Sequence, residues 1–240
     1  METNNYLNNN ENESYAPGNM ETDNLTKNIE EKLQFNNRKL TLNLIILGMA
    51  GSGKTTFVRK LEEEIAKSDN ESYIINMDPA VHDTLYEPNL DIKDTIKYKD
   101  IMLANGLGPN GAIITCLNLF ATNINKIVDL LEQKKDLDYI VVDTPGQLEV
   151  FSWSASGKII SDSLSLIFPT VLVYIVDIPR CQNPNTFASN MLYALSIMYK
   201  MKLPLILAFN KKDVVKEDQC LEWINDFEAL QVNSIIVITL

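Results

Sequence analysis

The chain has 240 residues, of which 45% are hydrophobic, enough for one sizeable core. Its formal net charge of −11 produces a surface that repels nucleic acid and anionic membranes, so we expect no direct nucleic-acid partner. No apolar run reaches about 18 residues, so we expect no membrane span. Three scattered cysteines and a single histidine show no metal-ligand spacing and favour a reducing, cytoplasmic location.

The first 38 residues differ in composition from the rest, because eleven of them are Asn and few are large and apolar. Such a stretch buries too little surface to offset its chain entropy, so we predict that residues 1–38 are disordered. Residues 25–35 can form a short helix, and a partner-binding arm is the functional alternative. We expect residues 39–240 to form a single folded domain.

A glycine-rich loop follows the first apolar run, residues 42–47, and precedes a helix-forming run, residues 56–67. The loop is Gly48-Met49-Ala50-Gly51-Ser52-Gly53-Lys54-Thr55. This spacing predicts a phosphate-binding loop whose N–H groups and helix dipole face one anion. Lys54 can reach the β and γ phosphates, and the Thr55 hydroxyl can bind Mg²⁺. The alternative is a plain glycine-rich turn.

The second predicted strand, residues 73–77, ends at Asp78. An acidic residue at the carboxyl end of a strand beside a phosphate loop lies where open α/β sheets bind ligands. Asp78 can hold Mg²⁺ through water or orient an attacking water, or it can simply form a cap or turn before Pro79. A loop over residues 82–89 and a helix over residues 92–102 are expected next.

Three glycines and a proline lie within Gly106–Gly111, which predicts a fixed, tight loop. The loop is either only a turn or a site where Asn110, or the loop N–H groups, faces a phosphate. Residues 113–131 then predict one helix with an apolar stripe against the sheet. The stripe consists of Leu117, Phe120, Ile124, Ile127 and Leu131.

Another buried strand, residues 139–142, leads into Asp143-Thr144-Pro145-Gly146-Gln147. Asp143 is expected to bind Mg²⁺, and the Gly146 N–H to reach the γ-phosphate. Gln147 can position a water molecule, and Glu149 can support that water. Residues 151–157 are predicted to be either a switch segment or a packed loop.

Two further strands are predicted over residues 171–176 and 204–209. The helix between them, residues 187–202, has Met191, Leu195 and Met198 on one face, and we interpret the two methionines as core filler rather than as a docking stripe. The second strand ends in Asn210-Lys211-Lys212-Asp213, the pattern that reads guanine. Asp213 can accept hydrogen bonds from two guanine donors that adenine lacks, so adenine would leave it unpaired. Lys211 can lie over the base or brace the phosphate loop.

Residues 222–230 predict a helix, and the apolar residues 232–240 predict a last strand. No Ser-Ala-type loop follows to cover the other side of the base, so we expect the domain to be incomplete at its C-terminal end. The whole pattern predicts an α/β P-loop NTPase, with a mostly parallel sheet and helices on both faces.

These motifs together resemble the GPN-loop GTPases over about residues 42–231. The motifs that carry the resemblance are Gly48–Thr56, Asp78-Pro79-Ala80, Gly106–Gly111, Asp143–Phe151, Trp153–Gly157 and Phe209–Asp213. The triplet Gly108-Pro109-Asn110 corresponds to the one that names the family.

The resemblance implies a dimeric protein that binds GTP and GDP and hydrolyses GTP with Mg²⁺. Asn110 would then contact the γ-phosphate region of the partner's nucleotide. Asp78 and Gln147 would hold the attacking water, with Glu149 close by, and Thr55 and Asp143 would serve Mg²⁺. A homodimer, or a heterodimer with a related GPN-loop protein, is expected. Eukaryotic members suggest a role in assembly or nuclear import of RNA polymerase II, with shuttling between cytoplasm and nucleus.

Three other functions remain open from the sequence. The first is a nucleotide-gated protein-binding module that hydrolyses little GTP. The second is a metal-inserting GTPase, which the single histidine and the absence of paired cysteines disfavour. The third is a P-loop kinase, which the guanine-reading pattern Asn210–Asp213 disfavours.

Overall fold

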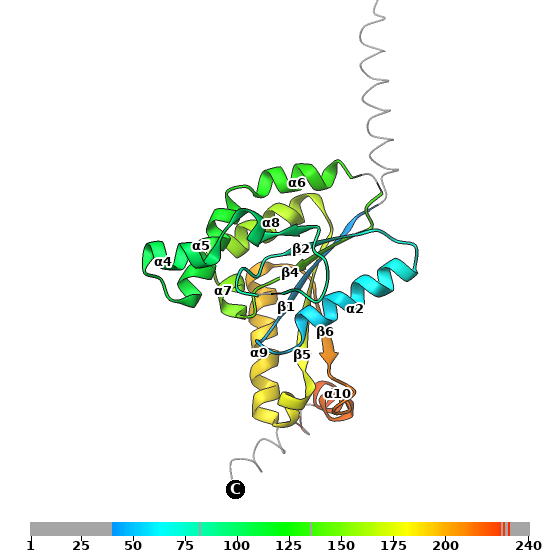
Figure 1. The fold of residues 1–240 in the computed structure, drawn as a ribbon. Helices are drawn as coiled ribbons and strands as arrows, with labels where there is room; N and C mark the ends of the chain where they lie inside the picture. Colours follow the sequence, from blue (N-terminus) through cyan, green and yellow to red (C-terminus); the bar gives the residue numbers. More distant parts are fainter. Residues whose placement is uncertain (1–39, 82, 135, 227, 229, 231–240) are drawn as a thin grey trace, which may run out of the picture. The chain divides into compact units, whose positions relative to one another are not determined.

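The computed structural model describes residues 40–81, 83–134, 136–226, 228 and 230 (Figure 1). The predicted disorder of residues 1–38 and the predicted last strand over residues 232–240 lie outside the described residues.

Six strands form one sheet in the order β3-β2-β4-β1-β5-β6. They are β1 (Leu42–Gly48), β2 (Ser72–Asn76), β3 (Leu90–Asp91), β4 (Tyr139–Asp143), β5 (Thr170–Asp177) and β6 (Leu205–Asn210). Every pairing between them is parallel. The predicted α/β P-loop fold is therefore confirmed, with all five longer strands close to their predicted positions and β3 as an addition.

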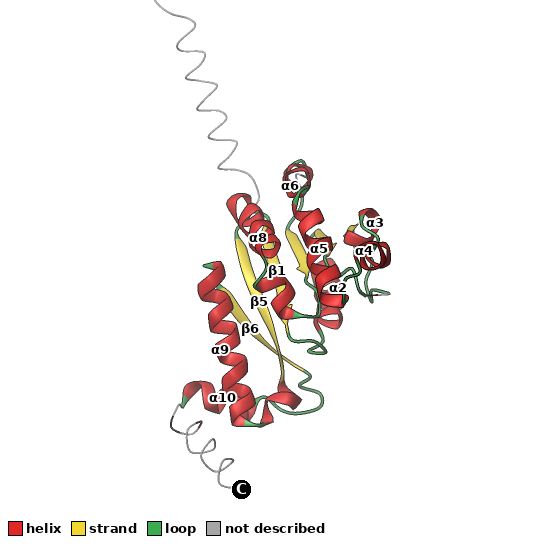
Figure 2. Ribbon diagram, turned by 90° about the vertical axis from the view of Figure 1, so that its left-hand side faces the viewer, coloured by secondary structure: helices red, strands yellow, loops and turns green. Residues whose placement is uncertain are grey.

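Helices connect the strands and cover both faces of the sheet (Figure 2). The α-helices are α2 (Lys54–Lys67), α3 (Ile92–Thr95), α4 (Tyr98–Asn105), α5 (Pro109–Ala121), α6 (Ile124–Glu132), α7 (Leu148–Ser152), α8 (Ala155–Ile167), α9 (Pro184–Met201) and α10 (Asp218–Asn225). A short 3₁₀ helix, η1 (Ile178–Gln182), follows β5.

The two faces of the sheet are covered unequally. Alternate strand residues such as Ile45 and Leu47 belong to the larger core, which is completed by side chains from α5 to α10. Their neighbours Leu44 and Ile46 point to the other face, where Val58 and Ile65 of α2 complete a smaller core. In Figure 1, α2 lies on the opposite side of the strands from α5, α7 and α8. Burial on both faces explains why the strands read as continuous apolar runs.

The single helix predicted over residues 113–131 is wrong, because the structure divides this stretch into α5 and α6, which are bent by 54°. The break falls at Thr122 and Asn123, where the Thr122 hydroxyl donates to the Leu119 carbonyl at 2.6 Å. Asn123 then adopts a non-helical conformation as the N-cap of α6. The predicted apolar stripe nevertheless packs on the larger core on both sides of the break.

The tight loop predicted for residues 106–111 is shorter than expected. Gly106 ends α4 in the left-handed conformation, at φ 57°. Pro109 occupies the first turn of α5, where its fixed φ suits the helix and its missing N–H costs nothing. Asn110 and Gly111 therefore belong to the first turn of a helix rather than to a loop.

The packed loop considered for residues 151–157 is wrong, since they contain the end of α7 and the start of α8, and the switch segment stays a prediction. Ser154 separates the two helices as an N-cap, and its side chain accepts a hydrogen bond from the Gly157 N–H at 3.0 Å. The helix predicted over residues 92–102 is likewise split into α3 and α4, with Ile96 in an extended conformation between them.

The interpretation of Met198 as core filler is wrong. Leu195 is 54% exposed and Met198 is 37% exposed, whereas Met191 packs against the larger core. The buried face of α9 instead contains Phe187, Ala194, Ile197 and Met201 among its apolar side chains. Helix α10 also begins and ends earlier than the helix predicted over residues 222–230.

Within the described part of the chain, no single helix is long and apolar enough to cross a bilayer. The bent pair α5–α6 reaches the necessary length and apolar composition, and it meets only these two criteria.

Candidate functional site

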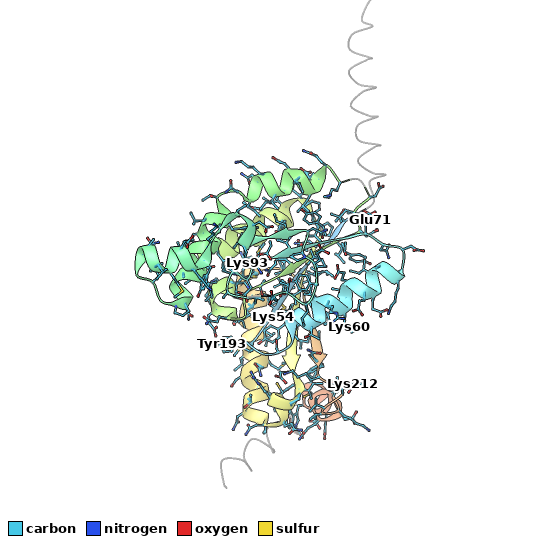
Figure 3. All side chains as sticks on the ribbon, viewed as in Figure 1. Lys54, Lys60, Glu71, Lys93, Tyr193 and Lys212 are labelled. Atoms are coloured by element: carbon cyan, nitrogen blue, oxygen red, sulfur yellow. The ribbon has the colours of Figure 1, made fainter. Side chains whose placement is uncertain are left out.

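The carboxyl ends of the strands align the polar residues that the sequence singled out. In the sheet register, Asn76 of β2 lies beside Asp143 of β4, which lies beside Ile46 of β1. On the other side of β1, Asp177 of β5 pairs with Asn210 of β6. All of these positions border the loop that follows β1, which is where parallel α/β sheets bind ligands. Figure 3 shows Lys54 at this central edge.

The predicted phosphate loop joins β1 to α2 with three residues at positive φ, namely Gly48 at 153°, Gly51 at 76° and Gly53 at 93°. Lys54 is 6% exposed and its Nζ donates to the Gly48 carbonyl at 2.9 Å. Burial lowers the pKa of Lys54, whereas the carboxylates of Asp143 and Asp78 act in the opposite direction. The lysine is thus held inside the loop, next to the two acidic strand ends.

The remaining loop residues differ in exposure. Ser52 is buried, Met49 and Thr55 are half-buried, and Ala50 and Thr56 are exposed. Because the helix dipole and free N–H groups of α2 begin at this point, the loop can bind an anion with its backbone.

The end of β6 is bonded directly to the phosphate loop. The Asn210 side-chain amide donates to the Ser52 carbonyl at 2.8 Å, and Lys211 Nζ donates to the Gly51 carbonyl at 2.8 Å. Of the two roles predicted for Lys211, the structure shows bracing of the loop. A Cβ added at Gly53 would collide with the Asn210 amide, so glycine is required there by contact as well as by φ.

Asp177 and Arg180 also hold this loop, and the sequence analysis assigned neither a role. Asp177 is 7% exposed and accepts from Lys211 Nζ at 2.7 Å. Arg180 lies 3.3 Å from the same carboxylate and donates to the Ala50 carbonyl at 2.8 Å. The available signal was another acidic residue at a strand end, followed three residues later by an arginine.

Asp213, the predicted guanine-reading residue, lies in the turn after β6 and is exposed. The turn starts at Lys211, which has a φ of 66°, so the backbone reverses direction there. Asp213 therefore projects from the same segment that braces the phosphate loop.

Asp143 lies buried at the end of β4, 3% exposed. Its Oδ2 accepts a hydrogen bond from the Tyr86 hydroxyl at 2.8 Å. Burial raises the pKa of Asp143 to about 6, although Tyr86, Lys54 and the Thr55 side chain favour its charged form. The other oxygen, Oδ1, is buried and makes no hydrogen bond within the described residues.

Asp78 lies at the end of β2 and is 7% exposed. Its Oδ2 accepts from the Gly146 N–H at 3.0 Å, which joins the segment predicted to serve Mg²⁺ or water to the one predicted to reach the γ-phosphate. Its Oδ1 accepts from the Ala80 N–H at 3.0 Å, forming the turn considered as the alternative. Asp78 therefore shapes the local backbone and also lies in the site.

Gln147 and Glu149 follow β4 on α7. Gln147 is half-buried and precedes the helix without a capping hydrogen bond from its side chain. Glu149 is exposed in the first turn.

The triplet Gly108-Pro109-Asn110 is exposed, at the start of α5. The Tyr98 hydroxyl donates a weak hydrogen bond to the Pro109 carbonyl at 3.4 Å. Over the part of the chain that the structure describes, Asn110 makes no hydrogen bond to the phosphate loop. Contacts join the phosphate loop to the end of β6 and join Asp78 to Gly146, whereas Asp213, Glu149 and Asn110 are exposed.

The residues at the strand ends fit Mg²⁺, which prefers oxygen ligands. The Thr55 hydroxyl and the carboxylates of Asp143 and Asp78 supply such oxygens close to the phosphate loop. The free, buried Asp143 Oδ1 is the specific observation that favours a cation, because an uncompensated buried carboxylate oxygen is costly.

Tyr86 is a further residue of this site whose role was missed at the level of sequence. It lies in the loop between β2 and β3, and its ring belongs to the smaller core. Burial and nearby carboxylates, led by Asp143, raise the pKa of Tyr86 far above its ordinary range. No spacing or motif signals its role, because its partner Asp143 is 57 residues further along the chain.

Comparison with known proteins adds the family. A family model described as "Conserved hypothetical ATP binding protein" matches residues 46–235. GPN-loop GTPase 1 of Dictyostelium discoideum is 53% identical over 194 residues, which are 80% of this chain and 49% of that protein. GPN-loop GTPase 1 of Saccharomyces cerevisiae is 55% identical over 189 residues, which are 78% of this chain and 49% of that protein. The chain thus spans about half the length of these curated relatives.

A crystal structure of a GTPase from Pyrococcus abyssi in its apo form superimposes with a TM-score of 0.71. It is 28% identical, and the match covers 80% of this chain and 77% of that one. This superposition agrees with the α/β fold described above. The chain belongs to the GPN-loop GTPase family.

Proposed function

We propose that this chain binds GTP and hydrolyses it to GDP and phosphate with Mg²⁺ as cofactor. The observation that carries the proposal is the direct bonding between the end of β6 and the phosphate loop, through Asn210 and Lys211. A nucleotide bound with its base at Asp213 and its phosphates at α2 would be held at both ends by one connected unit. Such rigid positioning is what phosphoryl transfer requires.

Each site residue then has a defined task. Lys54 and the loop N–H groups stabilise the charge that develops on the phosphate oxygens. Thr55 and Asp143 would hold Mg²⁺, which supplies Lewis-acid stabilisation of that charge when bound. Asp78 and Gln147 orient the attacking water in line with the bond that breaks, with Glu149 as support.

The choice of guanine over adenine rests on Asp213. The family description mentions ATP, whereas the two relatives are named GTPases. We favour guanine because a carboxylate can accept from its N1–H and its 2-amino group, and adenine offers neither donor. A site built on such hydrogen bonds rejects the base that cannot make them.

The test is a titration of the 240-residue chain with GDP and with ADP, each with Mg²⁺. We expect GDP to bind at least about a hundredfold more tightly, the size that unpaired polar groups produce. The variant Asp213→Asn replaces one acceptor by a donor, so it should lose GDP affinity and gain affinity for xanthosine diphosphate. Asp218→Asn, at an exposed acidic residue nearby in α10, is the matched control and should change neither.

Equal binding of GDP and ADP would contradict the assignment of guanine. If neither GDP nor ADP bound, that result would contradict nucleotide binding by this stretch of chain.

The resemblance to GPN-loop GTPases supports further proposals about the cellular role. We propose that the chain acts as a dimer, either with itself or with a related GPN-loop protein. We also propose that it serves the assembly or nuclear import of RNA polymerase II and moves between cytoplasm and nucleus. The exposed position of Asn110 at the start of α5 supports contact with a second subunit.

A nucleotide-gated binding module with little hydrolysis is the second candidate, favoured by exposed apolar side chains on α9. Leu192 is 67% exposed, Leu195 54% and Tyr199 85%. Such side chains gathered on one helix are typical of protein-binding surfaces. Turnover close to background, combined with nucleotide-dependent capture of a partner, would favour this candidate over the enzyme.

A further inference from the structure

The loop between β2 and β3 inserts a tyrosine next to the predicted magnesium site. The Tyr86 hydroxyl donates to Asp143 Oδ2 at 2.8 Å, and Tyr86 itself is 6% exposed. Asp143 Oδ1 has no partner among the described residues and is buried. The two oxygens of one carboxylate therefore differ: one is occupied by a phenol, and the other is left free beside Lys54 and Thr55.

The position of the Tyr86 hydroxyl is fixed by its surroundings. Its ring packs in the smaller core with residues that include Ile46, Ile74 and Val141. The Thr84 hydroxyl donates to the Tyr86 carbonyl at 2.7 Å, and Asn89 binds the backbone of Ile74 through its own N–H and its side-chain oxygen. Because the ring and the loop backbone are both anchored, the hydroxyl is a preorganised donor rather than a mobile one.

We propose that Tyr86 is a positioning residue for the magnesium ion, because it fixes the Asp143 carboxylate so that Oδ1 faces the metal position. The inference rests on the proposed function, since it needs Mg²⁺ at Thr55 and Asp143. Partners that orient a metal-binding carboxylate are worth roughly 10- to 100-fold in metal affinity. Tyr86 acts through Asp143 and contacts neither nucleotide nor metal in this arrangement.

The experiment follows release of a fluorescent GDP analogue from the chain while free Mg²⁺ is varied. Bound metal slows the release of GDP phosphates, so the midpoint of this dependence reports metal affinity at the site. We expect Tyr86→Phe to raise the midpoint roughly 10- to 100-fold. The release rate with excess chelator should stay within about twofold of wild type, because the base and phosphate contacts are unchanged.

Two variants separate positioning from a general structural effect. Tyr174→Phe removes another buried hydroxyl, one that has no hydrogen-bond partner among the described residues, and should leave the midpoint unchanged. In an Asp143→Asn background, Tyr86→Phe should change the Mg²⁺ midpoint by less than about twofold. The effects of the two substitutions are not additive, because Tyr86 acts through Asp143.

The other outcomes overturn the inference in distinguishable ways. An unchanged midpoint in Tyr86→Phe, with a magnesium response retained in wild type, overturns the role of Tyr86 alone. A full effect of Tyr86→Phe in the Asp143→Asn background shows that it does not act through Asp143. GDP release from wild type that ignores Mg²⁺ overturns the proposed magnesium site, and the inference with it.

Discussion

At the scale of single residues, Asp143 is a functional carboxyl group whose burial lowers the stability of the nucleotide-free fold. It is 3% exposed, and burial raises its pKa from an ordinary value of 3.8 to about 6. A carboxylate that is harder to ionise in the folded chain weakens the nucleotide-free fold at neutral pH. The benefit comes when a cation is bound, because the same burial strengthens the attraction between opposite charges.

Because of this burial, the free energy of unfolding should depend on pH through Asp143. Between pH 3.8 and about 6 the folded chain keeps a proton on Asp143 that the unfolded chain releases, so stability falls as the pH rises through this window. The complete effect is at most about 3 kcal/mol in the free energy of unfolding. Asp143→Asn should remove this slope and be the more stable protein above pH 6, in urea unfolding with chelator present.

Wild type and variant would instead give parallel stability curves if the carboxyl titrated normally. That result would contradict the burial argument for Asp143.

At the scale of elements, the junction of β1, the phosphate loop and α2 depends on glycine for two separate reasons. Gly53 has a φ of 93°, which L-residues rarely adopt, and any Cβ there would meet the Asn210 amide. Gly106, which ends α4, also has a positive φ, of 57°, but nothing lies within 4 Å of the position its Cβ would take. A side chain at Gly106 would thus cause backbone strain alone, whereas one at Gly53 would cause both strain and a collision with Asn210.

We expect Gly106→Ala to cost about 1 kcal/mol in unfolding free energy, the size of left-handed strain alone. Gly53→Ala should cost more than that, because Asn210 must also move and lose its hydrogen bond to the Ser52 carbonyl. GDP affinity should fall only in Gly53→Ala. Thermal unfolding and a GDP titration of both variants provide the measurement. Equal losses of unfolding free energy and of GDP affinity in the two variants would show that the contact with Asn210 is unimportant.

Much of the element pattern was predictable, because strands buried on both faces produce apolar runs and each is followed by a polar motif. The runs around Ile45, Val142 and Ile175 identified β1, β4 and β5, and the acidic strand ends identified the site edge. The break at Thr122 was not predictable, since the apolar stripe keeps its spacing across it.

The contacts that support the site also could not be predicted from the sequence. Tyr86 reaches Asp143 only because the chain between β2 and β3 folds back under α2, and Asp177 reaches the phosphate loop only through Lys211 and Arg180. Met198 was misread because helical spacing identifies an apolar stripe without telling whether a neighbouring element covers it.

At the scale of the whole molecule, the outward position of Asn110 separates nucleotide binding from catalysis. The phosphate loop and the end of β6 are joined within one chain, whereas Asn110 is exposed on α5 and makes no bond to either within the described residues. We propose that a second subunit uses this exposed group to act on the nucleotide. Binding should therefore be a property of one chain and turnover a property of the assembly.

Asn110→Ala should lower GTP turnover by roughly 100-fold, the effect of removing one preorganised donor at developing charge. GDP affinity should remain within about twofold of wild type. Asn105→Ala, at an exposed residue of α4 whose amide bonds only to the Ile101 carbonyl, is the matched control. Turnover per wild-type chain should also rise with protein concentration. Unchanged turnover in Asn110→Ala, independent of concentration, would contradict action between subunits.

The uneven coverage of the sheet has a consequence for how the molecule opens. The smaller core is covered by α2 and by Tyr86, and both of these pieces end at the nucleotide site, at Lys54 and at Asp143. A nucleotide bound in the proposed site would thus contact the elements that close this face. Local opening of α2 and release of the nucleotide are therefore coupled. Raising the free nucleotide concentration should slow hydrogen exchange of the backbone amides that α2 covers.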